Sequence, residues 1–559
     1  MAPVQYDAIV VGSGISGGMA AKELCERGFK TLLLERGRNV EHVKDYPNAQ
    51  KDPWQLPHHG MTTQAVAREH RVLRRGRVLW EPVVDFFVND RQCPYTESKP
   101  FTWVRGYQVG GRSLTWGRLS LRWSDFDFGA NAAEGVGVDW PIRYADIAPW
   151  YDHVERFAGI SGTREGLSQL PDGQFLPPIP LNVVEQAVAK RVREHYHDRR
   201  RIITGRIANL SEAHNGRGAC QYRDKCVLGC PFGAYFSTQS ASLPAAVRTG
   251  KLTLRPFSIV QRVTFDKATR RATGVEVLDA ETKQSVTFTA KVIFLCASTF
   301  NSTAVLMRSA TDEWPGGLGS SSGELGHNVM DHHLRAGASG RVEGFDDRTV
   351  HGRTPNGFYV PRYRNLFGDK RSYLRGFGYQ GSASRQDWSR NVAELGIGAS
   401  LKAALTEPGP WTIGMTGFGE TLPYHENRMV LDEEKKDAWG MASIAFDCEI
   451  RDNEKAMRRD MMQDAAEMFE AAGVKDVVPV DHGYTFGEAV HEMGSARMGR
   501  DPKTSVLNGN NQVWDALNVF VTDGACMASS SCVNPSLTYM ALTARAAEFA
   551  AHALRNGTL

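Results

Sequence analysis

The chain has 559 residues, which is long enough for more than one hydrophobic core. Its 66 Lys and Arg residues are nearly balanced by 63 Asp and Glu residues, and this argues against a dedicated nucleic-acid or membrane-surface binder. No apolar stretch approaches the roughly eighteen residues of a transmembrane helix, and the first residues lack the pattern of a secretory signal peptide.

The first 37 residues predict a strand, a helix and a second strand. Ala8–Val11 is a short apolar run typical of a buried parallel strand, and Ile15–Arg27 carries helix formers after a glycine-rich turn. Thr31–Leu34 is a second apolar strand, and it ends on Glu35. Glu35 lies about twenty residues after the glycines, and an acidic residue at this distance can accept hydrogen bonds from the ribose hydroxyls of a dinucleotide.

The turn itself reads Gly12-Ser-Gly14-Ile-Ser-Gly17. In this pattern the first glycine allows the tight turn, the second lets a pyrophosphate approach the backbone, and the third lets the helix lie close to the sheet. The helix N-terminus adds unpaired N–H groups for the phosphates. A lone motif of this kind also fits a surface loop, but the flanking strands, helix and acid favour dinucleotide binding.

The next region shows little periodicity, and we expect 38–103 to form long loops that cover the first domain. A second glycine-rich segment follows at Arg105–Gly117 and contains Gly110-Gly-Arg-Ser113. Asp139–Tyr151 opens a helix that we expect to run to about Gly159.

Three cysteines then lie within eleven residues, at Cys220, Cys226 and Cys230, and a proline follows the last. Thiolates at such spacing can converge on one iron–sulfur centre, and a Cys-Pro end also occurs in ferredoxin-type runs. Structural zinc with His214 as a fourth ligand is one alternative, although the CxxC knuckles typical of zinc are absent. A disulfide, disfavoured inside a cell, and three unrelated core cysteines are the others.

Strand-like alternation returns after this loop. Leu252–Phe265 and Gly274–Leu278 alternate, and Lys291–Ser298 is a buried strand whose Cys296 we assign to the core. A helix starts at Thr299. From His332 to Glu449 the chain is rich in Gly and aromatics, with half-buried strands at Trp411–Phe418 and Ala442–Cys448 that suit the floor of a sugar site or an ordinary antiparallel sheet.

The C-terminal part holds the candidate catalytic residues. A helix over 452–472 places its methionines on one face, more typical of a core than of a functional site. His491 precedes a glycine-rich Gly-Ser-Ala-Arg-Met-Gly stretch, Asp523 follows an apolar strand, and Asn534-Pro535 begins the last helix. Taken alone, Asn534-Pro535 reads as a helix N-cap followed by proline at the first helical position.

Three signatures together resemble the flavin-dependent GMC oxidoreductases, named for glucose, methanol and choline enzymes: the nucleotide loop near the N-terminus, Gly110–Ser113, and the ending built on His491 and Asn534. The resemblance covers essentially the whole chain. It implies FAD as cofactor, with Gly111, Ser113 and Asp523 as flavin contacts beside the nucleotide loop. Some relatives attach the flavin covalently through a histidine in Ser-Thr-His-Trp, whereas this chain has Thr115 at that place, so we expect FAD to be held non-covalently.

In the family, a histidine such as His491 takes the substrate hydroxyl proton as general base, and Asn534 orients the same hydroxyl. The hydride then passes to flavin N5, and the last helix N-terminus favours the negative charge of the reduced ring. The cysteine spacing resembles a bacterial branch that holds a [3Fe-4S] cluster on three cysteines. Such a cluster would pass the two flavin electrons singly to a partner.

The implied fold class is α/β: a Rossmann-like FAD-binding domain assembled from discontinuous segments, and a substrate domain with a largely antiparallel sheet and helices. We assign 1–330 to the FAD-binding domain, including the cover loops 38–103 and an iron–sulfur segment 215–235. Residues 331–470 form the substrate domain, and 471–559 return to the FAD-binding domain with the catalytic residues.

The sequence therefore predicts an FAD-dependent dehydrogenase that oxidises a secondary alcohol of a sugar. Val490 is apolar where some glucose-oxidising relatives carry Asn, and this favours C3 of glucosides, giving 3-keto sugars, over glucose at C1 or gluconate at C2. An oxygen-using pyranose oxidase is a rival in the same fold. A non-catalytic electron-transfer subunit is a rival of another class, and His491 and Asn534 argue against it.

The expected partners are a sugar or glucoside, a small companion subunit, and a cytochrome or other electron acceptor. Iron–sulfur assembly indicates folding in the cytoplasm, while relatives with this cysteine pattern act on extracellular sugars. A companion that carries a twin-arginine export signal would take the folded pair to the periplasm and reconcile the two.

Overall fold

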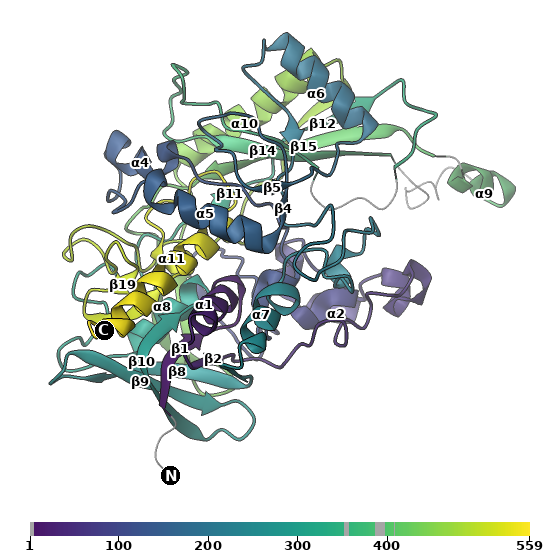
Figure 1. Ribbon diagram of the computed structural model, residues 1–559. Coiled ribbons are helices and arrows are strands. Elements are labelled where there is room, and N and C mark those ends of the chain that lie inside the picture. Colours follow the sequence, from purple (N-terminus) through teal and green to yellow (C-terminus); the bar gives the residue numbers. More distant parts are fainter. Residues whose placement is uncertain (1–4, 351–356, 386–396, 407) are drawn as a thin grey trace.

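An eight-stranded sheet built from three distant parts of the chain forms the lower half of the molecule in Figure 1. The computed structural model describes residues 5–350, 357–385, 397–406 and 408–559. The central strands run in the order β19-β20-β10-β1-β2-β7, and β8 and β9 extend the sheet from β10. These strands are β1 (Gln5–Val11), β2 (Thr31–Leu34), β7 (Leu252–Arg255), β8 (Ser258–Asp266), β9 (Arg271–Asp279), β10 (Ser285–Leu295), β19 (Gln512–Val513) and β20 (Ala516–Val521).

The centre of this sheet is parallel, because β1 pairs in parallel with both β10 and β2, and β10 pairs in parallel with β20. Parallel strands covered by helices on both faces are apolar throughout, which explains the continuous apolar runs of β1 and β2. The α/β fold assembled from discontinuous segments is thus confirmed. The covering helices are α1 (Ile15–Glu26), α5 (Tyr144–Ala158), α7 (Leu243–Arg248), α8 (Thr299–Arg308) and α11 (Ser536–Arg555).

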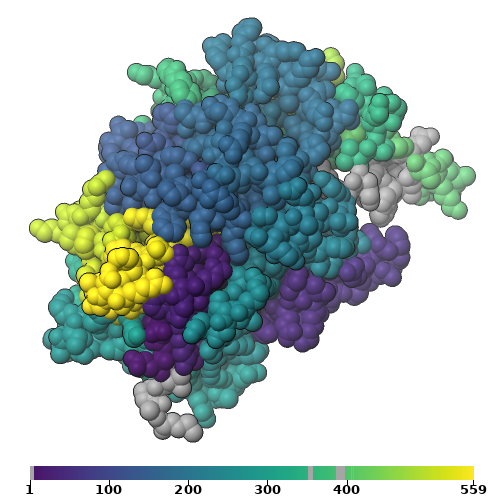
Figure 2. Space-filling model, viewed as in Figure 1, coloured from purple at the N-terminus to yellow at the C-terminus, as the bar shows by residue number. Residues whose placement is uncertain are grey.

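The helices α1 and α11, which are far apart in the sequence, lie side by side. In the space-filling view of Figure 2, the yellow surface of α11 adjoins the purple surface of α1. The Arg27 guanidinium after α1 contacts the carboxylate of Glu548 on α11 at 2.5 Å. The C-terminal helix therefore completes the layer that covers the first strand.

A seven-stranded antiparallel sheet forms the upper half of the molecule in Figure 1, in the order β18-β12-β15-β14-β13-β6, with β11 paired to β15. Its strands are β6 (Ile203–Thr204), β11 (His332–His333), β12 (Ala336–Val342), β13 (Phe358–Val360), β14 (Phe377–Arg385), β15 (Trp411–Glu420) and β18 (Lys475–Asp481). The helices α6 (Val183–His195) and α10 (Asp452–Ala471) lie on it, and α9 (Ala399–Thr406) stands apart.

The predicted core face of α10 is confirmed, because Met457, Met461 and Met468 are fully buried against this sheet. The sheet also takes β6 from before residue 331 and β18 from after residue 470. Strand pairing thus crosses both of the domain boundaries drawn above, and the boundaries themselves stay a prediction.

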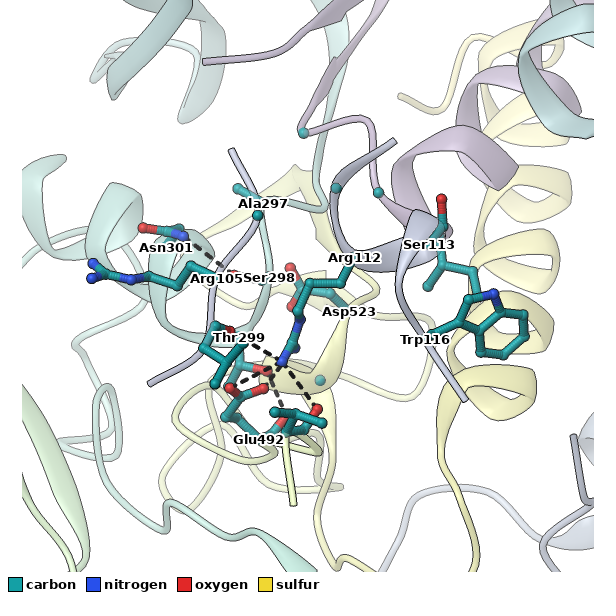
Figure 3. Close-up of a pocket in the computed structure, with 18 of the residues that line it drawn as sticks. Arg105, Arg112, Ser113, Trp116, Ala297, Ser298, Thr299, Asn301, Glu492 and Asp523 are labelled. Atoms are coloured by element: carbon teal, nitrogen blue, oxygen red, sulfur yellow. Dashed lines mark hydrogen bonds and ion pairs between the residues drawn. The ribbon is translucent and has the colours of Figure 1, made fainter. Parts of the chain in front are cut away.

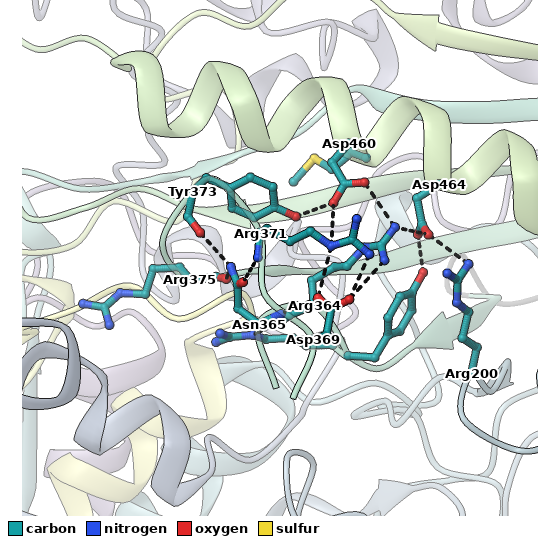
Figure 4. A network of polar contacts seen from close by, with 12 residues as sticks. Arg200, Arg364, Asn365, Asp369, Arg371, Tyr373, Arg375, Asp460 and Asp464 are labelled. Atoms are coloured by element: carbon teal, nitrogen blue, oxygen red, sulfur yellow. Dashed lines mark hydrogen bonds and ion pairs between the residues drawn. The ribbon is translucent and has the colours of Figure 1, made fainter. Parts of the chain in front are cut away.

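A buried polar network ties α10 to the segment that precedes β14 (Figure 4). The Asp464 carboxylate, on α10, lies 2.6 Å from the Arg364 guanidinium and 2.9 Å from that of Arg200. It also accepts a hydrogen bond of 2.9 Å from the Tyr379 hydroxyl on β14. Because each buried charge has a partner of opposite sign, the network fixes α10 on the sheet at one register.

Residues 38–103 depart from the expected long loops. They contain short helical turns at Pro53–Gln55, Pro57–Gly60 and Glu81–Phe86, and the short helices α2 (Gln64–Glu69) and α3 (Arg71–Arg75). Proline in the first turn and the Thr63 side chain, which caps α2, start these elements locally. Such turns are too short to show hydrophobic periodicity, so they could not be predicted from the sequence pattern.

The remaining strands are short or form a small third sheet. They are β3 (Thr96–Glu97), β16 (Arg428–Lys436) and β17 (Ala442–Asp447) in one sheet, and β4 (Ile160–Ser161) with β5 (Phe175–Leu176) in another. The helix α4 (Asp125–Glu134) precedes α5. In the part of the chain that the structure describes, no helix has both the length and the apolar character needed to cross a bilayer.

Candidate active site

A cavity of about 580 Å³ lies between the two large sheets and is lined by residues from both. One end is formed by the turn between β1 and α1, and the other by side chains of β14, β15 and the segment before α11. Figure 3 shows part of its wall, with Arg112 and Glu492 in contact at the centre and Ser113 and Trp116 to the right. All the predicted FAD contacts except Gly17 line this cavity: Gly12, Gly14, Glu35, Gly111, Ser113, Asp523 and Asn534.

The three glycines of the first turn differ in the space around them: Gly12 and Gly17 leave no room for a side chain, and Gly14 faces open space, as the dinucleotide motif requires. Gly12 has φ of +90°, and a Cβ there would lie 2.5 Å from the carbonyl oxygen of Cys296. A Cβ on Gly17 would lie 1.8 Å from the oxygen of Gly12, whereas one on Gly14 would meet no atom within 4 Å. The open space stands over Gly14 and the uncapped N-terminus of α1, so the turn fits a pyrophosphate.

Glu35 is buried at the end of β2, where its carboxylate holds the turn together. It accepts hydrogen bonds from the Ser13 amide at 3.1 Å, the Ser13 hydroxyl at 2.6 Å and the Gly37 amide at 3.1 Å. Burial raises its pKa above the usual value. The carboxylate still lines the cavity, and the ribose contact stays a prediction.

The second glycine-rich segment makes a tight turn over Gly111–Leu114. The Ser113 hydroxyl donates to the carbonyl of Gly110 at 2.6 Å and accepts from the Thr238 amide at 3.0 Å. Opposite this turn, the Asp523 carboxylate accepts from the Ser302 hydroxyl at 2.5 Å, and burial raises the pKa of Asp523 to about 6. Protein groups already hold both side chains, so they present fixed positions to a cofactor.

His491 and Asn534 meet in the cavity wall, as the sequence predicts, with Asn534 Nδ2 3.4 Å from His491 Nε2. The N-cap interpretation of Asn534 is wrong: Pro535 occupies that position, and no side-chain cap bond is made. The Asn534 side chain instead accepts a hydrogen bond of 2.7 Å from Gln380 Nε2 on β14. Asn534 lines the cavity, with its oxygen held by Gln380 and its nitrogen beside His491.

The backbone at His491 is held in an unusual shape by Asp331. Val490 has φ of +57°, which is rare for a β-branched residue and indicates strain at a functional position. The fully buried Asp331 carboxylate accepts from the amides of Ala489 and His491, each at 3.1 Å, and from the Tyr484 hydroxyl at 2.9 Å. Burial raises the pKa of Asp331 to about 7.

On the other side of this segment, Arg112 forms an ion pair with Glu492 at 2.7 Å and donates to the Val490 carbonyl at 3.1 Å (Figure 3). The Thr299 hydroxyl donates to the carbonyl of Glu492 at 2.6 Å. These contacts fix the 489–492 segment to the predicted flavin-contact turn. The position of His491 thus depends on both halves of the cavity.

Sequence reasoning missed His332, whose Nδ1 lies 2.9 Å from Nδ1 of His491. It also missed Asp331, Gln380 and the Arg112–Glu492 pair. The run Asp331-His-His333 was the available signal, because three consecutive titratable residues that are all fully buried are unusual. Nothing in the sequence indicates the distance between this run and His491.

The three clustered cysteines lie in the loop before the buried turn at Thr238–Ser242. Among the described residues, no group of three or more His, Cys, Asp or Glu side chains is arranged to hold a single metal ion. His214, the candidate fourth zinc ligand, instead places its Nε2 2.7 Å from the Arg156 carbonyl. All nine cysteines are free of disulfide bonds, and Cys296 is buried in the core as predicted.

Burial raises the pKa of the Cys220 and Cys226 thiols, neighbouring cysteines raise both further, and the Arg118 guanidinium opposes the shift. The three thiols and this arginine are therefore electrostatic neighbours. Val227, directly after Cys226, lines the cavity. The cysteine loop thus adjoins the wall of the FAD site.

Comparison with known proteins identifies the family. The models of the family described as GMC oxidoreductase match residues 6–334 and 423–543. The chain belongs to the GMC oxidoreductases.

This GMC oxidoreductase is 27% identical to 2-methyl-1,2-propanediol dehydrogenase of Mycolicibacterium austroafricanum, over 98% of this chain and 95% of that one. It is 25% identical to the fructose dehydrogenase large subunit of Gluconobacter japonicus, over 99% and 98% of the two chains. The crystal structure of pyridoxine 4-oxidase from Mesorbium loti shares the fold, with a TM-score of 0.60, 16% identity, and coverage of 97% and 98%.

Family membership and the fit of the glycine turn together make this chain an FAD-dependent oxidoreductase of CH–OH donors. The bound flavin supplies a two-electron acceptor. What the chain adds is a half-buried histidine and an amide at one end of the cavity, with a nucleotide-binding turn at the other. This arrangement can remove a proton from a hydroxyl group that is held beside the flavin.

Proposed function

We propose that this GMC oxidoreductase is a sugar dehydrogenase that oxidises a secondary hydroxyl, with C3 of glucosides as the preferred position. The observation that carries the reaction type is the His491–Asn534 pair in the wall of the FAD cavity. Its electrons leave through a [3Fe-4S] cluster on Cys220, Cys226 and Cys230.

In the proposed reaction, neutral His491 accepts the hydroxyl proton at Nε2 while the Asn534 amide donates a hydrogen bond to the same oxygen. FAD, when bound, would accept the hydrogen of the carbinol carbon together with its electron pair, and the C–O bond would become a carbonyl. The substrate loses two electrons and two protons in total, one proton to His491 and one within the hydride. His491 then returns its proton to water.

A sugar as substrate is supported by the cavity wall and by the relatives. Gln380 and Phe418 face the cavity from β14 and β15, so an amide and an aromatic ring stand beside the catalytic pair. Planar rings of this kind suit the apolar face of a sugar, and amides suit its hydroxyls. The preference for C3 rests on Val490, which puts an apolar residue directly before the base.

The cluster is supported by the surroundings of the cysteine loop. Arg118 is 1% exposed, and within the described part of the chain its Nε and Nη1 have no hydrogen-bond partner. A buried cation with unpaired donors favours an anionic group beside it. Gly229 and Gly233 have positive φ, as in loops whose amides turn toward cluster sulfurs. A bound cluster would supply a one-electron carrier. Because a cluster has several atoms, its three cysteine thiols would lie farther apart than the ligands of a single metal ion.

The proposed partners follow from this route of electrons. A small companion subunit and a cytochrome or similar acceptor would complete it, and the name of one relative, a large subunit, is consistent with a companion. The chain would fold in the cytoplasm and reach the periplasm together with a companion that carries the export signal. The test of this arrangement is given in the Discussion.

The decisive experiment is a panel of sugars with an artificial electron acceptor, followed by product analysis by NMR. We expect glucosides to bleach the flavin and to give 3-keto sugars. A lactone from glucose or a 2-keto acid from gluconate would replace the C3 assignment. Oxygen consumption matching product would indicate an oxidase, and no bleaching by any sugar would indicate an electron-transfer subunit.

A further inference from the structure

A line of four polar side chains crosses the catalytic end of the cavity and ends on a backbone carbonyl. Gln380 contacts Asn534, and Asn534 contacts Nε2 of His491. Nδ1 of His491 lies 2.9 Å from Nδ1 of His332, and Nε2 of His332 lies 3.1 Å from the carbonyl oxygen of Ser530. Both ring nitrogens of each histidine therefore have a hydrogen-bond partner.

The carbonyl fixes the direction of every hydrogen bond in this line. A carbonyl oxygen only accepts, so His332 carries its proton on Nε2 and donates it to Ser530. A neutral imidazole has one N–H, which leaves Nδ1 of His332 as an acceptor. His491 must then donate from its own Nδ1, and its Nε2 has no proton. The Asn534 NH₂ group is the donor that matches this bare nitrogen.

We infer that His332 is a positioning residue that holds His491 in the tautomer whose unprotonated Nε2 faces the substrate hydroxyl. His332 is fully buried behind His491 and does not line the cavity, so it acts through the ring of His491. The inference rests on the proposed role of His491 as the base. It goes beyond that role by naming the group that selects which nitrogen is basic.

The surroundings keep both rings neutral. Withdrawal from water lowers the pKa of His332 to about 4, and it lowers that of His491 well below its usual value. The charged groups around the pair are the buried Asp331 carboxylate under the backbone of His491 and the Arg112–Glu492 ion pair beside it. The remaining titratable neighbour is His333, on the same strand β11.

Two substitutions of His332 separate positioning from packing. His332→Leu keeps the volume of the side chain and removes the acceptor, whereas His332→Asn keeps an oxygen at the branch that corresponds to Nδ1. His333→Leu is the matched control, because His333 is equally buried and, within the described residues, neither of its ring nitrogens has a hydrogen-bond partner.

The first measurement is anaerobic stopped-flow reduction of the flavin by the best sugar. We expect His332→Leu to lower the limiting rate by about 10- to 100-fold, the usual effect of losing a group that orients a functional histidine. The substrate dissociation constant should stay within about threefold, since Asn534 and the cavity wall are unchanged. His332→Asn should recover most of the rate, and His333→Leu should match the unmodified enzyme.

The second measurement does not depend on turnover. Nitrogen-15 NMR of protein labelled at histidine distinguishes a bare ring nitrogen from a protonated one, and His491→Gln assigns the signal. We expect a bare Nε2 in the unmodified protein and a mixture of tautomers in His332→Leu.

The outcomes separate this inference from the proposed function. A normal limiting rate in His332→Leu, or a protonated Nε2 of His491 in the unmodified protein, would overturn the positioning role. If no sugar reduces the flavin, the proposed function fails, while the NMR result still decides the tautomer.

Discussion

His491 is half-buried at the end of the cavity, and its Nε2 atom points toward the side chain of Asn534. We expect His491→Ala to keep FAD bound, because the nucleotide turn is distant from it, and to slow flavin reduction by sugar by about 10²- to 10⁴-fold, the usual contribution of a general base. Stopped-flow absorbance measures this rate. The same substitution at exposed His552 on α11 is the control. Single-turnover reduction at a normal rate would assign the base to another group.

The pKa of His491 also predicts the pH dependence of the reaction. Its usual value is about 6.5, and withdrawal from water, then the neighbouring His332 and Arg112, hold it well below this. A base must be unprotonated to act, so a lowered pKa keeps His491 active as the pH falls. We expect the limiting rate of flavin reduction to stay flat from about pH 8 to pH 6. A decline centred at the ordinary histidine pKa would contradict this.

Thr115 lines the cavity at the place where some relatives attach the flavin through histidine. A threonine hydroxyl cannot form that bond, so acid precipitation of the purified protein should release all of its flavin into the supernatant. Absorbance of the two fractions measures the release. Yellow colour that stays in the washed pellet would show a covalent link through some other residue.

At the scale of elements, the cysteine loop carries the prediction about electrons. Cys226→Ser should remove iron and the electron-spin signal of the cluster, while flavin reduction by sugar continues and transfer to the natural acceptor is lost. Iron and sulfide analysis with spin resonance measures this. Cys448→Ser, at a buried cysteine just after β17, is the control that should keep the cluster. Zinc without iron in the intact protein would contradict the proposal.

The elements that the sequence predicted well are those with a strong local pattern. The strand predicted at Thr31–Leu34 has the same bounds as β2, and the helix predicted to begin at Thr299 is α8. The methionine face of α10 is buried, as predicted. The run expected as one strand over 252–265 is broken into β7 and β8 at Pro256 and Phe257, where φ of Phe257 is +54°. Proline has no N–H group to donate to a neighbouring strand, so the strand is interrupted at Pro256 although apolar and polar residues alternate on either side of it.

The site was predicted where its residues carry a motif and missed where they act by proximity. Gly12, Gly14 and Glu35 line the cavity because they follow the ends of β1 and β2, and Asn534 lies just before α11, whereas His491 lies in the irregular segment between β18 and β19. His332 reaches His491 because Met330 forms a backbone bridge with Met493 and the Asp331 carboxylate holds the amide of His491. That pairing depends on the tertiary fold, which no local pattern encodes.

At the scale of the molecule, the remaining prediction concerns location and partner. The proposed companion would cover the surface around Cys226, where Tyr222 and Phe232 are each 43% exposed. Fractionation of the native host should place the activity in the periplasm and recover the chain with a smaller subunit. Activity confined to the cytosol, with the chain running alone on a sizing column, would contradict the proposed partner and compartment.

The contact between α1 and α11 has a consequence for biosynthesis. As the chain leaves the ribosome, β1, α1 and β2 emerge before their partners, so β1 must wait for β10, and α1 must wait for α11. The nascent chain therefore carries its complete nucleotide motif for most of translation without the walls that enclose it. We therefore expect FAD to be captured only after α11 has been made. A chain truncated before α11 should have every glycine of the turn and retain no flavin.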